Sequence, residues 1–289
     1  MKTLIFGATG LLGKALMRTS TGSESVVGLG SRDADLRSVD QVEHAIKVHA
    51  PEWIVLAAAY TDVDGCETNQ QLAWDVNCTG AVNVVRAAKQ SGARVVFLST
   101  DYVFDGTKRI PYETSDSRAA RAVYGKTKAE AEARILDLMP ECCVLRTSWV
   151  FGVGGKCFPD TILKLAASRA QLEVVDDQRG CPTYTVDLAR AIRLLTEQGA
   201  KGIVHGTNRG DCTWYDFARE IVGEAGLPTR VIHTTSEKFV RAAERPKYSV
   251  LSPTSLEQLR IEMPTWRDAL KRYLLERSEA QSPTFSQNT

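Results

Sequence analysis

The sequence of 289 residues has no long hydrophobic run, no targeting segment and almost no excess charge. No stretch approaches the roughly eighteen consecutive apolar residues of a membrane-spanning helix. The chain starts in a strand-like segment, without the apolar core and cleavage site of a secretory signal. Its net charge is +1 and it has no basic tract, so no strong field would attract nucleic acid or anionic lipid. We therefore expect a cytoplasmic protein, with neither nucleic acid nor a membrane as its partner.

Cysteine and histidine are present, but their spacing does not indicate a disulfide or metal site. The seven cysteines are odd in number and scattered, and they include no Cys-x-x-Cys. The four histidines show no ligand spacing, and His44 and His49 do not share a helical face. We expect neither a disulfide framework nor a metal site, which suits a reducing compartment.

What the sequence has is a regular alternation of apolar strands and amphipathic helices. The hydrophobic fraction of 43% and the charged fraction of 25% are those of an ordinary globular protein. In the first half, strands are predicted at residues 3–6, 25–30, 53–59, 93–100 and 142–149. Helices are predicted at residues 14–18, 39–49 and 77–90, and from Tyr124 onwards. The strands are continuous apolar runs, which predicts an α/β fold with a doubly wound parallel Rossmann sheet covered on both faces.

A glycine-rich turn follows the first predicted strand, in the context typical of dinucleotide binding. Gly7-x-x-Gly10-x-x-Gly13 lies between that strand and a helix. Gly7 permits a tight turn, Gly10 lets the backbone approach a pyrophosphate, and Gly13 lets the helix pack close to the sheet. The spacing differs from the more usual Gly-x-Gly-x-x-Gly, and a glycine-rich turn without a ligand is the alternative.

The end of the second strand indicates which dinucleotide binds. An acid there would hold the 2′-hydroxyl of the adenosine ribose, but this chain has Gly30-Ser31-Arg32. A guanidinium suits a 2′-phosphate, so we favour NADPH. Asp33 and Asp35 follow closely and could still bind a hydroxyl, which keeps NADH as an alternative.

The second half is less regular and predicts a second, smaller α/β lobe that binds substrate. Helices are expected at residues 159–168, 184–198, 214–225 and 265–277, and strands at 172–176 and 202–206. A single sheet could not easily accommodate all of these elements. We assign residues 1–150 and 184–210 to a dinucleotide-binding domain, 151–183 and 211–277 to the substrate lobe, and 278–289 to a disordered polar tail.

Tyr124 and Lys128 lie four residues apart at the start of a run of strong helix formers. That spacing puts both side chains on one helical face. A nearby ammonium stabilises a phenolate, so we expect the Tyr124 pKa to be lowered from its usual value of about 10. Such a phenol could exchange a proton with a sugar or alcohol oxygen near neutral pH. Taken alone, the pair also fits an exposed helix start with a packed tyrosine.

Together with Ser99-Thr100 at a strand end, these motifs resemble those of the extended short-chain dehydrogenases/reductases. Four further runs are more specific: Leu98-Ser-Thr-Asp-Tyr-Val-Phe-Asp-Gly106, Arg146-Thr-Ser-Trp-Val-Phe-Gly152, Asp177-Gln-Arg-Gly-Cys-Pro-Thr183 and Thr213-Trp-Tyr-Asp-Phe-Ala218. They resemble the dTDP-4-dehydrorhamnose reductase family, from Met1 to about Leu275. The resemblance implies NAD(P)H-dependent reduction of the 4-keto group of dTDP-4-dehydro-6-deoxy-L-mannose, which gives dTDP-L-rhamnose.

The resemblance also implies roles for the central residues. Tyr124 would donate a proton, Lys128 would hold the nicotinamide ribose and lower the phenol pKa, and Thr100 would hydrogen-bond the substrate carbonyl. A phenol and a hydroxyl there would stabilise the negative charge that ketone reduction places on oxygen. Ser99 and Thr100 face opposite sides of a strand, so only one can serve, and the family pattern selects Thr100.

Further contacts come from the same resemblance. Cofactor contacts are expected from Gly7, Gly10, Leu11, Leu12, Gly13, Arg32, Asp35, Leu36, Ala58, Ala59, Tyr60, Thr61 and Leu98. Substrate contacts are expected from Asp101, Tyr102, Trp149 and Arg245, besides Thr100. Trp149 could equally fill an interface between the lobes, and Arg245 could be solvated. Gly30 departs from the acid of NADH-preferring members of the family.

Some family members are described as metal-linked dimers, joined through acidic residues near the glycine-loop helix. Lys14-Ala15 offers no such acid, so we expect no magnesium requirement and either a monomer or a homodimer. Two other functions stay open. One is a reductase or epimerase for another nucleotide-linked 4-ketosugar. The other is a non-catalytic regulatory subunit like the β subunit of methionine adenosyltransferase, which resembles the same family.

Overall fold

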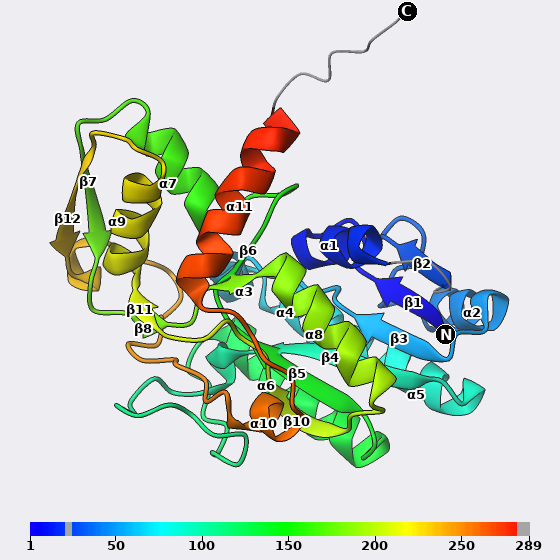
Figure 1. Ribbon diagram of the computed structural model, residues 1–289. Coiled ribbons are helices and arrows are strands. Elements are labelled where there is room, and N and C mark those ends of the chain that lie inside the picture. The colour runs from blue at the N-terminus through cyan, green and yellow to red at the C-terminus, as the bar shows by residue number, and fades with distance from the viewer. Residues whose placement is uncertain (21–24, 282–289) are drawn as a thin grey trace, which may run out of the picture.

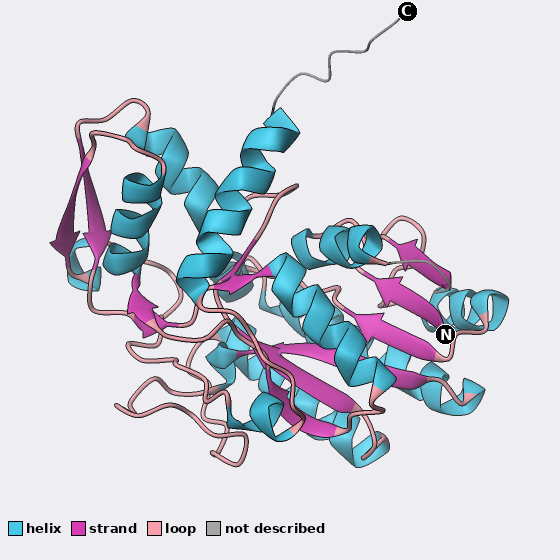
Figure 2. Ribbon diagram, in the orientation of Figure 1, coloured by secondary structure: helices cyan, strands magenta, loops and turns pink. Residues whose placement is uncertain are grey.

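The computed structural model describes residues 1–20 and 25–281. Its main structural unit is a six-stranded parallel sheet. Its strands are β1 (Lys2–Phe6), β2 (Ser25–Leu29), β3 (Trp53–Leu56), β4 (Arg94–Thr100), β5 (Cys143–Thr147) and β10 (Gly202–His205). They lie in the order β2-β1-β3-β4-β5-β10, and every neighbouring pair is parallel. The doubly wound parallel fold predicted from the apolar runs is confirmed (Figure 2).

Helices cover both faces of this sheet, as Figure 1 shows. The helices are α1 (Leu11–Thr19) and α8 (Thr185–Glu197) on one face, and α2 (Val39–His49), α5 (Ala81–Ser91) and α6 (Val123–Leu138) on the other. All four residues of β3 are buried because each side of the strand meets a helical layer. Two separate apolar clusters result, one on each face, as expected for strands that are hydrophobic along their whole length.

The strand order reverses between β1 and β3, and this reversal creates the site. Ligands of doubly wound sheets bind at such a switch point, beyond the carboxyl ends of the strands. β1 is followed directly by Gly7, whose φ of +94° suits only glycine. A Cβ on Gly7 would lie 2.5 Å from the Ala58 nitrogen, and one on Gly13 would lie 2.1 Å from the Gly7 carbonyl oxygen. The glycines therefore allow β1, the start of α1 and the chain after β3 to meet.

Two predicted strands end earlier than expected. The strand predicted to run through residue 59 ends at Leu56, where the chain turns to pack against Gly7. The strand predicted to run through residue 149 ends at Thr147, because Trp149 has a φ of +46° that no strand accommodates. In both places, the residues that leave the sheet line the cavity described below.

The predicted helix at residues 77–90 is two segments. A π-helical turn η1 (Asp75–Gly80) precedes α5. Within it, the Asn77 amide accepts a hydrogen bond from Tyr60 N (2.7 Å) and donates to Tyr60 O (3.1 Å) and Thr127 Oγ1 (3.2 Å). These bonds fasten the loop after β3 and helix α6 to the same side chain, a contact that no hydrophobic period could reveal.

The second lobe lies beside the carboxyl ends of the main strands (Figure 1). It is built from β6 (Val150–Phe151), α7 (Phe158–Ala166), β7 (Gln171–Val175), β8 (Arg179–Gly180), β9 (Thr183–Tyr184), β11 (Cys212–Thr213), α9 (Trp214–Glu224), β12 (Arg230–Thr234) and α11 (Trp266–Gln281). β7 pairs with β12, β8 with β11, and β6 with β9. An aromatic core that includes Phe151, Tyr184, Phe217 and Tyr273 joins these elements. The division into two domains at the residues given above stays a prediction.

Several short elements were not predicted. They are α3 (Val63–Thr68), α4 (Gln70–Trp74), α10 (Thr254–Gln258), the two-residue strands, β12, and the 3₁₀ turns η2 (Asp101–Val103) and η3 (Ser236–Lys238). Most of them are too short to show a hydrophobic period. Helix α11 also extends to Gln281, four residues into the predicted disordered tail, where Glu279, Ala280 and Gln281 are good helix formers. The rest of that tail, residues 282–289, lies outside the described residues.

Three further features concern membrane spans, metal sites and cysteines. In the part of the chain that the structure describes, no helix is long and apolar enough to cross a membrane. Over the same residues, no cluster of three or more His, Cys, Asp or Glu side chains could hold a metal ion. All seven cysteines are buried free thiols.

Candidate active site

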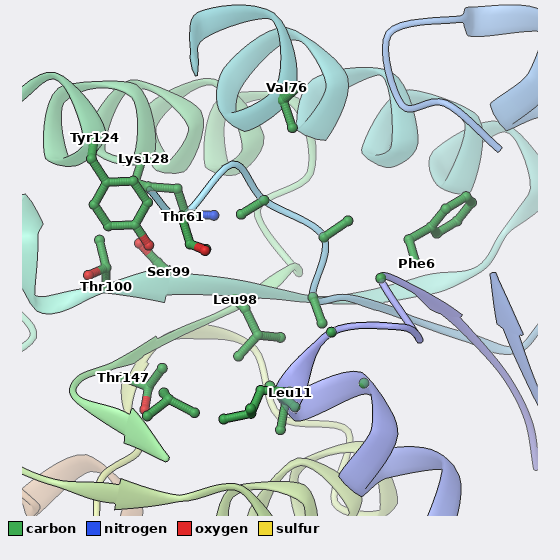
Figure 3. A pocket seen from close by; sticks show the side chains of 18 of the residues that line it. Phe6, Leu11, Thr61, Val76, Leu98, Ser99, Thr100, Tyr124, Lys128 and Thr147 are labelled. Carbon is green, nitrogen blue, oxygen red and sulfur yellow. The ribbon is translucent and has the colours of Figure 1, made fainter. Parts of the chain in front are cut away.

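A cavity of about 800 Å³ opens where β1, β3 and β4 end. That volume lies in the upper part of the range for ligand pockets. Its lining runs from Gly30 and Asp35 at the end of β2, past the glycine loop, to Thr100 and Tyr124 and on to Trp149 and Trp214. Figure 3 shows Leu11 at the glycine loop, Leu98 in the middle, and Tyr124, Lys128 and Thr100 at the opposite end. The cavity thus joins the glycine loop to the tyrosine-lysine helix.

Most residues expected to bind cofactor or substrate line this cavity. Those that do are Gly7, Gly10, Leu11, Leu12, Gly13, Asp35, Leu36, Ala58, Ala59, Thr61, Leu98, Thr100, Asp101, Tyr102, Tyr124, Lys128 and Trp149. Arg32, Tyr60 and Arg245 are not among the lining residues. Arg37 and Trp214, which the sequence reasoning did not select as site residues, also line the cavity. Asn77 and Glu132 were not selected either, and they hydrogen-bond to Thr127 and Ser99.

The tyrosine-lysine pair projects from the start of α6 toward the end of β4 (Figure 3). The Thr100 hydroxyl donates to Asp101 Oδ1 (3.0 Å) and accepts from Tyr102 N (3.2 Å). Tyr102 packs edge-on against Tyr124, with ring centroids 5.7 Å apart. These contacts fix a phenol and a hydroxyl side by side on two regular elements, which is the arrangement that a proton donor and a carbonyl-binding group need.

The pKa of Tyr124 is shifted in the direction opposite to the one expected. Burial raises the pKa of Tyr124, against a smaller lowering from the Thr100 hydroxyl. Burial also lowers the pKa of Lys128, to about 7, against the raising effect of Glu132. The charged groups that act on Tyr124, led by Asp101, raise its pKa further, so the predicted lowering by Lys128 was wrong. A protonated Tyr124 is nevertheless the form that a proton donor requires.

Beneath the pair lies a buried charge network. Glu132, one turn beyond Lys128, accepts from Arg146 Nε at 2.9 Å and Nη2 at 2.7 Å, and from the Ser99 hydroxyl. Both charged side chains are at most 1% exposed. Ser99 therefore bonds to α6, while its neighbour Thr100 bonds to Asp101. The network ties β4, β5 and α6 together directly below Tyr124, Lys128 and Thr100.

At the β2 end, Arg37 lines the cavity and Arg32 does not, and the contact of Arg32 with a 2′-phosphate stays a prediction. The Asp33 carboxylate accepts from Gly30 N at 2.7 Å and closes a tight turn that leaves Arg32 exposed, outside the cavity. Arg37 lines the cavity and makes a bidentate contact with Asp35, Nε at 3.0 Å and Nη2 at 2.6 Å. This contact lowers the pKa of Asp35. In the sequence, the only sign of this contact was that Asp35 and Arg37 are two residues apart.

Arg245 and Tyr60 support the walls instead of lining the cavity. Arg245 pairs with Asp64 of α3 at 2.6 and 2.8 Å, and this pairing holds the Asp64 pKa at about 2. The expected contact between Arg245 and a diphosphate therefore has no support in its position. Tyr60 packs with Cys66 and Val123 behind Tyr124.

At the border between the lobes, Trp149 stacks face to face on Trp214, with centroids 3.4 Å apart and planes 5° from parallel. Both indoles line the cavity. Trp149 thus fills the border between the lobes and also lines the cavity, and its contact with substrate stays a prediction. Asp101, close by, is 2% exposed, and burial raises its pKa to about 6.

A doubly wound sheet with a glycine loop after its first strand, and a tyrosine-lysine helix beside a threonine at the end of β4, defines the extended short-chain dehydrogenase/reductase class. Comparison with known proteins gives the family. The chain belongs to the RmlD substrate binding domain family, whose model matches residues 1–278. The resemblance seen in the sequence motifs is confirmed.

Individual relatives cover most of the chain. It is 39% identical to a dTDP-4-dehydrorhamnose reductase of Mycobacterium tuberculosis, over 87% of this chain and 84% of the relative. It is also 39% identical to a dTDP-4-keto-6-deoxy-D-glucose reductase of Streptomyces niveus, over 86% and 87%. A crystal structure of the dTDP-4-dehydrorhamnose reductase of Bacillus anthracis in complex with NADP superposes with a TM-score of 0.92. That relative is 34% identical, and the match covers 95% of this chain and 99% of the other.

Proposed function

We propose that the protein uses NADPH to reduce the 4-keto group of dTDP-4-dehydro-6-deoxy-L-mannose, giving dTDP-L-rhamnose. The observation that carries this proposal is the single cavity that joins the glycine loop to Tyr124, Lys128 and Thr100. The family and its NADP-bound member support the same chemistry.

The residues present fit a dinucleotide. Gly7 and Gly13 leave no room for a Cβ, Gly10 stands at the N-cap of α1, and the first turn of that helix has no acidic residue. Backbone N–H groups at such a helix start suit a pyrophosphate. Leu98, Ala58 and Thr61 would flank the nicotinamide half, and Asp35, Leu36 and Arg37 the adenosine half.

The protein's part in the reaction is proton donation and charge stabilisation. The cofactor supplies hydride to C4 when bound. Tyr124 Oη donates its proton to the ketone oxygen as negative charge develops there, which leaves a phenolate to be reprotonated by water. Thr100 Oγ1, which donates to Asp101 in this structure, would turn its hydrogen to the same oxygen and stabilise it, and Lys128 would hold the nicotinamide ribose.

A second candidate function keeps this chemistry and changes the sugar. It is favoured by one observation: relatives named for different dTDP-4-ketosugars match this chain at the same 39% identity. A non-catalytic role is less well supported, because Thr100, Tyr124 and Lys128 are all present and line one cavity.

One assay tests both candidates. The purified protein is supplied with NADPH and a panel of dTDP- and UDP-linked 4-ketosugars, and loss of the nicotinamide absorbance is followed. We expect the fastest turnover with dTDP-4-dehydrorhamnose. Turnover of another dTDP-4-ketosugar alone would favour the second candidate, and no oxidation with any sugar would contradict both.

The setting of the reaction is part of the proposal. Seven unpaired cysteines suit a reducing compartment such as the cytoplasm. We expect a monomer or a homodimer by light scattering, and full activity in the presence of a chelator, since Lys14-Ala15 offers no acid to a bridging magnesium ion.

A further inference from the structure

Trp149 adopts a backbone conformation that a bulky side chain rarely takes. Its φ is +46°, in the left-handed region that costs free energy for any residue with a Cβ. Neighbouring bonds hold it there: Thr183 N donates to Trp149 O at 3.2 Å, and the Ser148 hydroxyl donates to Cys181 O at 2.7 Å. Strain of this kind persists only where the surroundings impose it, and it concentrates at functional sites.

The indole of Trp149 is as constrained as its backbone. Trp214 covers it face to face at 3.4 Å, although aromatic rings prefer an offset or edge-to-face arrangement. Gly180 approaches so closely that a Cβ there would lie 2.6 Å from Trp149 Cε2 and 2.7 Å from Nε1. Trp214 is held in turn by Phe158, with centroids 4.4 Å apart.

Helix α9 fixes the position of Trp214. Its first residue is Trp214, and Thr213 and Asp216 form a reciprocal capping box immediately around it. A capping box fixes where a helix begins and the direction in which its first side chain leaves. Trp214 therefore comes from the second lobe on a rigid helix start and reaches the cavity at the border where Trp149 leaves the main sheet.

We propose that Trp214 is a positioning residue for sugar-nucleotide binding: by stacking on Trp149, it holds the Trp149 indole as a fixed wall for the sugar ring. This inference rests on the proposed function. Trp149 comes two residues after Thr147, the strand partner of Thr100, so the wall lies beside the Thr100 end of the cavity and not at Asp35 beyond β2. Aromatic surfaces recognise the C–H-rich face of a deoxysugar through its apolar area.

The test separates sugar binding from cofactor binding. In Trp214→Ala, we expect KM for the ketosugar to rise roughly three- to tenfold, the scale of one aromatic pair, while KM for NADPH stays unchanged. Trp214→Phe keeps an aromatic face and should restore most of the affinity. Tyr215→Phe is the matched control, because this neighbouring ring lies against His233 and does not line the cavity.

Gly180→Ala gives an independent perturbation that leaves Trp214 in place. Its added Cβ must displace the Trp149 indole, so it should reproduce the KM effect of Trp214→Ala. Circular dichroism supplies a spectroscopic check, because two stacked indoles give a coupled signal that should vanish in Trp214→Phe and Trp149→Phe. Thermal melts establish that each variant is folded.

The outcomes are distinct. If the wild type turns over a ketosugar, but folded Trp214→Ala and Gly180→Ala keep its KM, the positioning role is refuted and the proposed function stands. An equal rise in the KM values for sugar and NADPH would indicate general damage to the lobe and would also refute it. If the wild type neither binds nor reduces any dTDP-linked ketosugar, both proposals fall together.

Discussion

The two ends of the cavity are built by different means. The glycine-loop end is formed by the backbone. Gly7 and Gly13 allow backbone segments to approach closely, and the start of α1 offers its N–H groups. At the Tyr124 end, buried side chains predominate, and burial shifts the pKa values of Tyr124, Lys128 and Asp101. An end made of backbone is disrupted by adding atoms, whereas an end made of buried polar groups is disrupted by removing them.

The largest effect is expected from removing one oxygen at the polar end. Tyr124→Phe deletes the proton donor and should lower kcat by about 10²- to 10⁴-fold, the usual contribution of general acid catalysis. Because the ring remains, Kd for NADPH should stay near the wild-type value. Stopped-flow kinetics and fluorescence titration measure the two quantities. Tyr60→Phe, which alters a ring behind the cavity, is the control and should keep its kcat.

The next effect concerns the charged rim at the β2 end. Arg37→Ala should weaken NADPH binding by roughly 10- to 100-fold, the scale of a hydrogen-bonded charge pair, and leave NADH binding almost unchanged. Arg32→Ala is the matched control, because Arg32 is exposed and outside the cavity. Equal losses for both dinucleotides in Arg37→Ala, or a selective loss in Arg32→Ala, would contradict this assignment.

Adding one carbon at the backbone end should also be costly. The Cβ of Gly13→Ala would lie 2.1 Å from the Gly7 carbonyl oxygen, so the loop must move. We expect about 1–3 kcal/mol of lost stability, and weaker NADPH binding. Gly223→Ala is the control: it lies in helix α9 with no atom within 4 Å of an added Cβ. That variant should gain a few tenths to about 1 kcal/mol.

The smallest effect is a pH dependence. Because the pKa of Lys128 is about 7, the amine loses its charge as pH rises through 7, and NADPH binding should weaken several-fold. Lys128→Met has no proton to lose, so its Kd should be weaker overall but flat across this range. A pH step of the same size in Lys128→Met would assign it to another group.

The lowered pKa of Lys128 also affects stability. A lysine in an ordinary salt bridge loses its stabilising effect as pH rises, whereas the effect of Lys128 changes in the opposite direction. Between pH 7 and the ordinary lysine pKa of 10.5, the unfolded chain binds more protons at Lys128 than the folded chain does. The unfolding free energy contributed by Lys128 therefore rises with pH over this window, and Lys128→Met removes that rise. Chemical denaturation at several pH values measures it.

Sequence reasoning succeeded where one local rule decides the structure. The apolar runs predicted the parallel sheet, and helical spacing predicted that Tyr124 and Lys128 share a face. It failed where distant groups decide. Arg245 pairs with Asp64, 181 positions away, and the pKa of Tyr124 is raised mainly by burial of its ring in the folded chain.

Two further outcomes have local causes. The Asp33 side chain accepts from Gly30 N in the turn after β2, where Arg32 lies outside the cavity and Arg37 lines it, so which arginine binds a 2′-phosphate stays a prediction. The helix start at Trp214 was predicted, and Thr213 and Asp216 form the capping box around it, but Trp214 was not selected as a site residue. No local sequence pattern shows that Trp214 stacks on Trp149.

Isotope transfer tests the central claim most directly. NADPH carrying deuterium at its transferable nicotinamide position is incubated with the protein and dTDP-4-dehydrorhamnose, and the sugar product is examined by mass spectrometry and NMR. The cavity described here predicts one deuterium at C4 of the product, with none released to water. Unchanged cofactor and sugar, or deuterium recovered in the solvent, would contradict it.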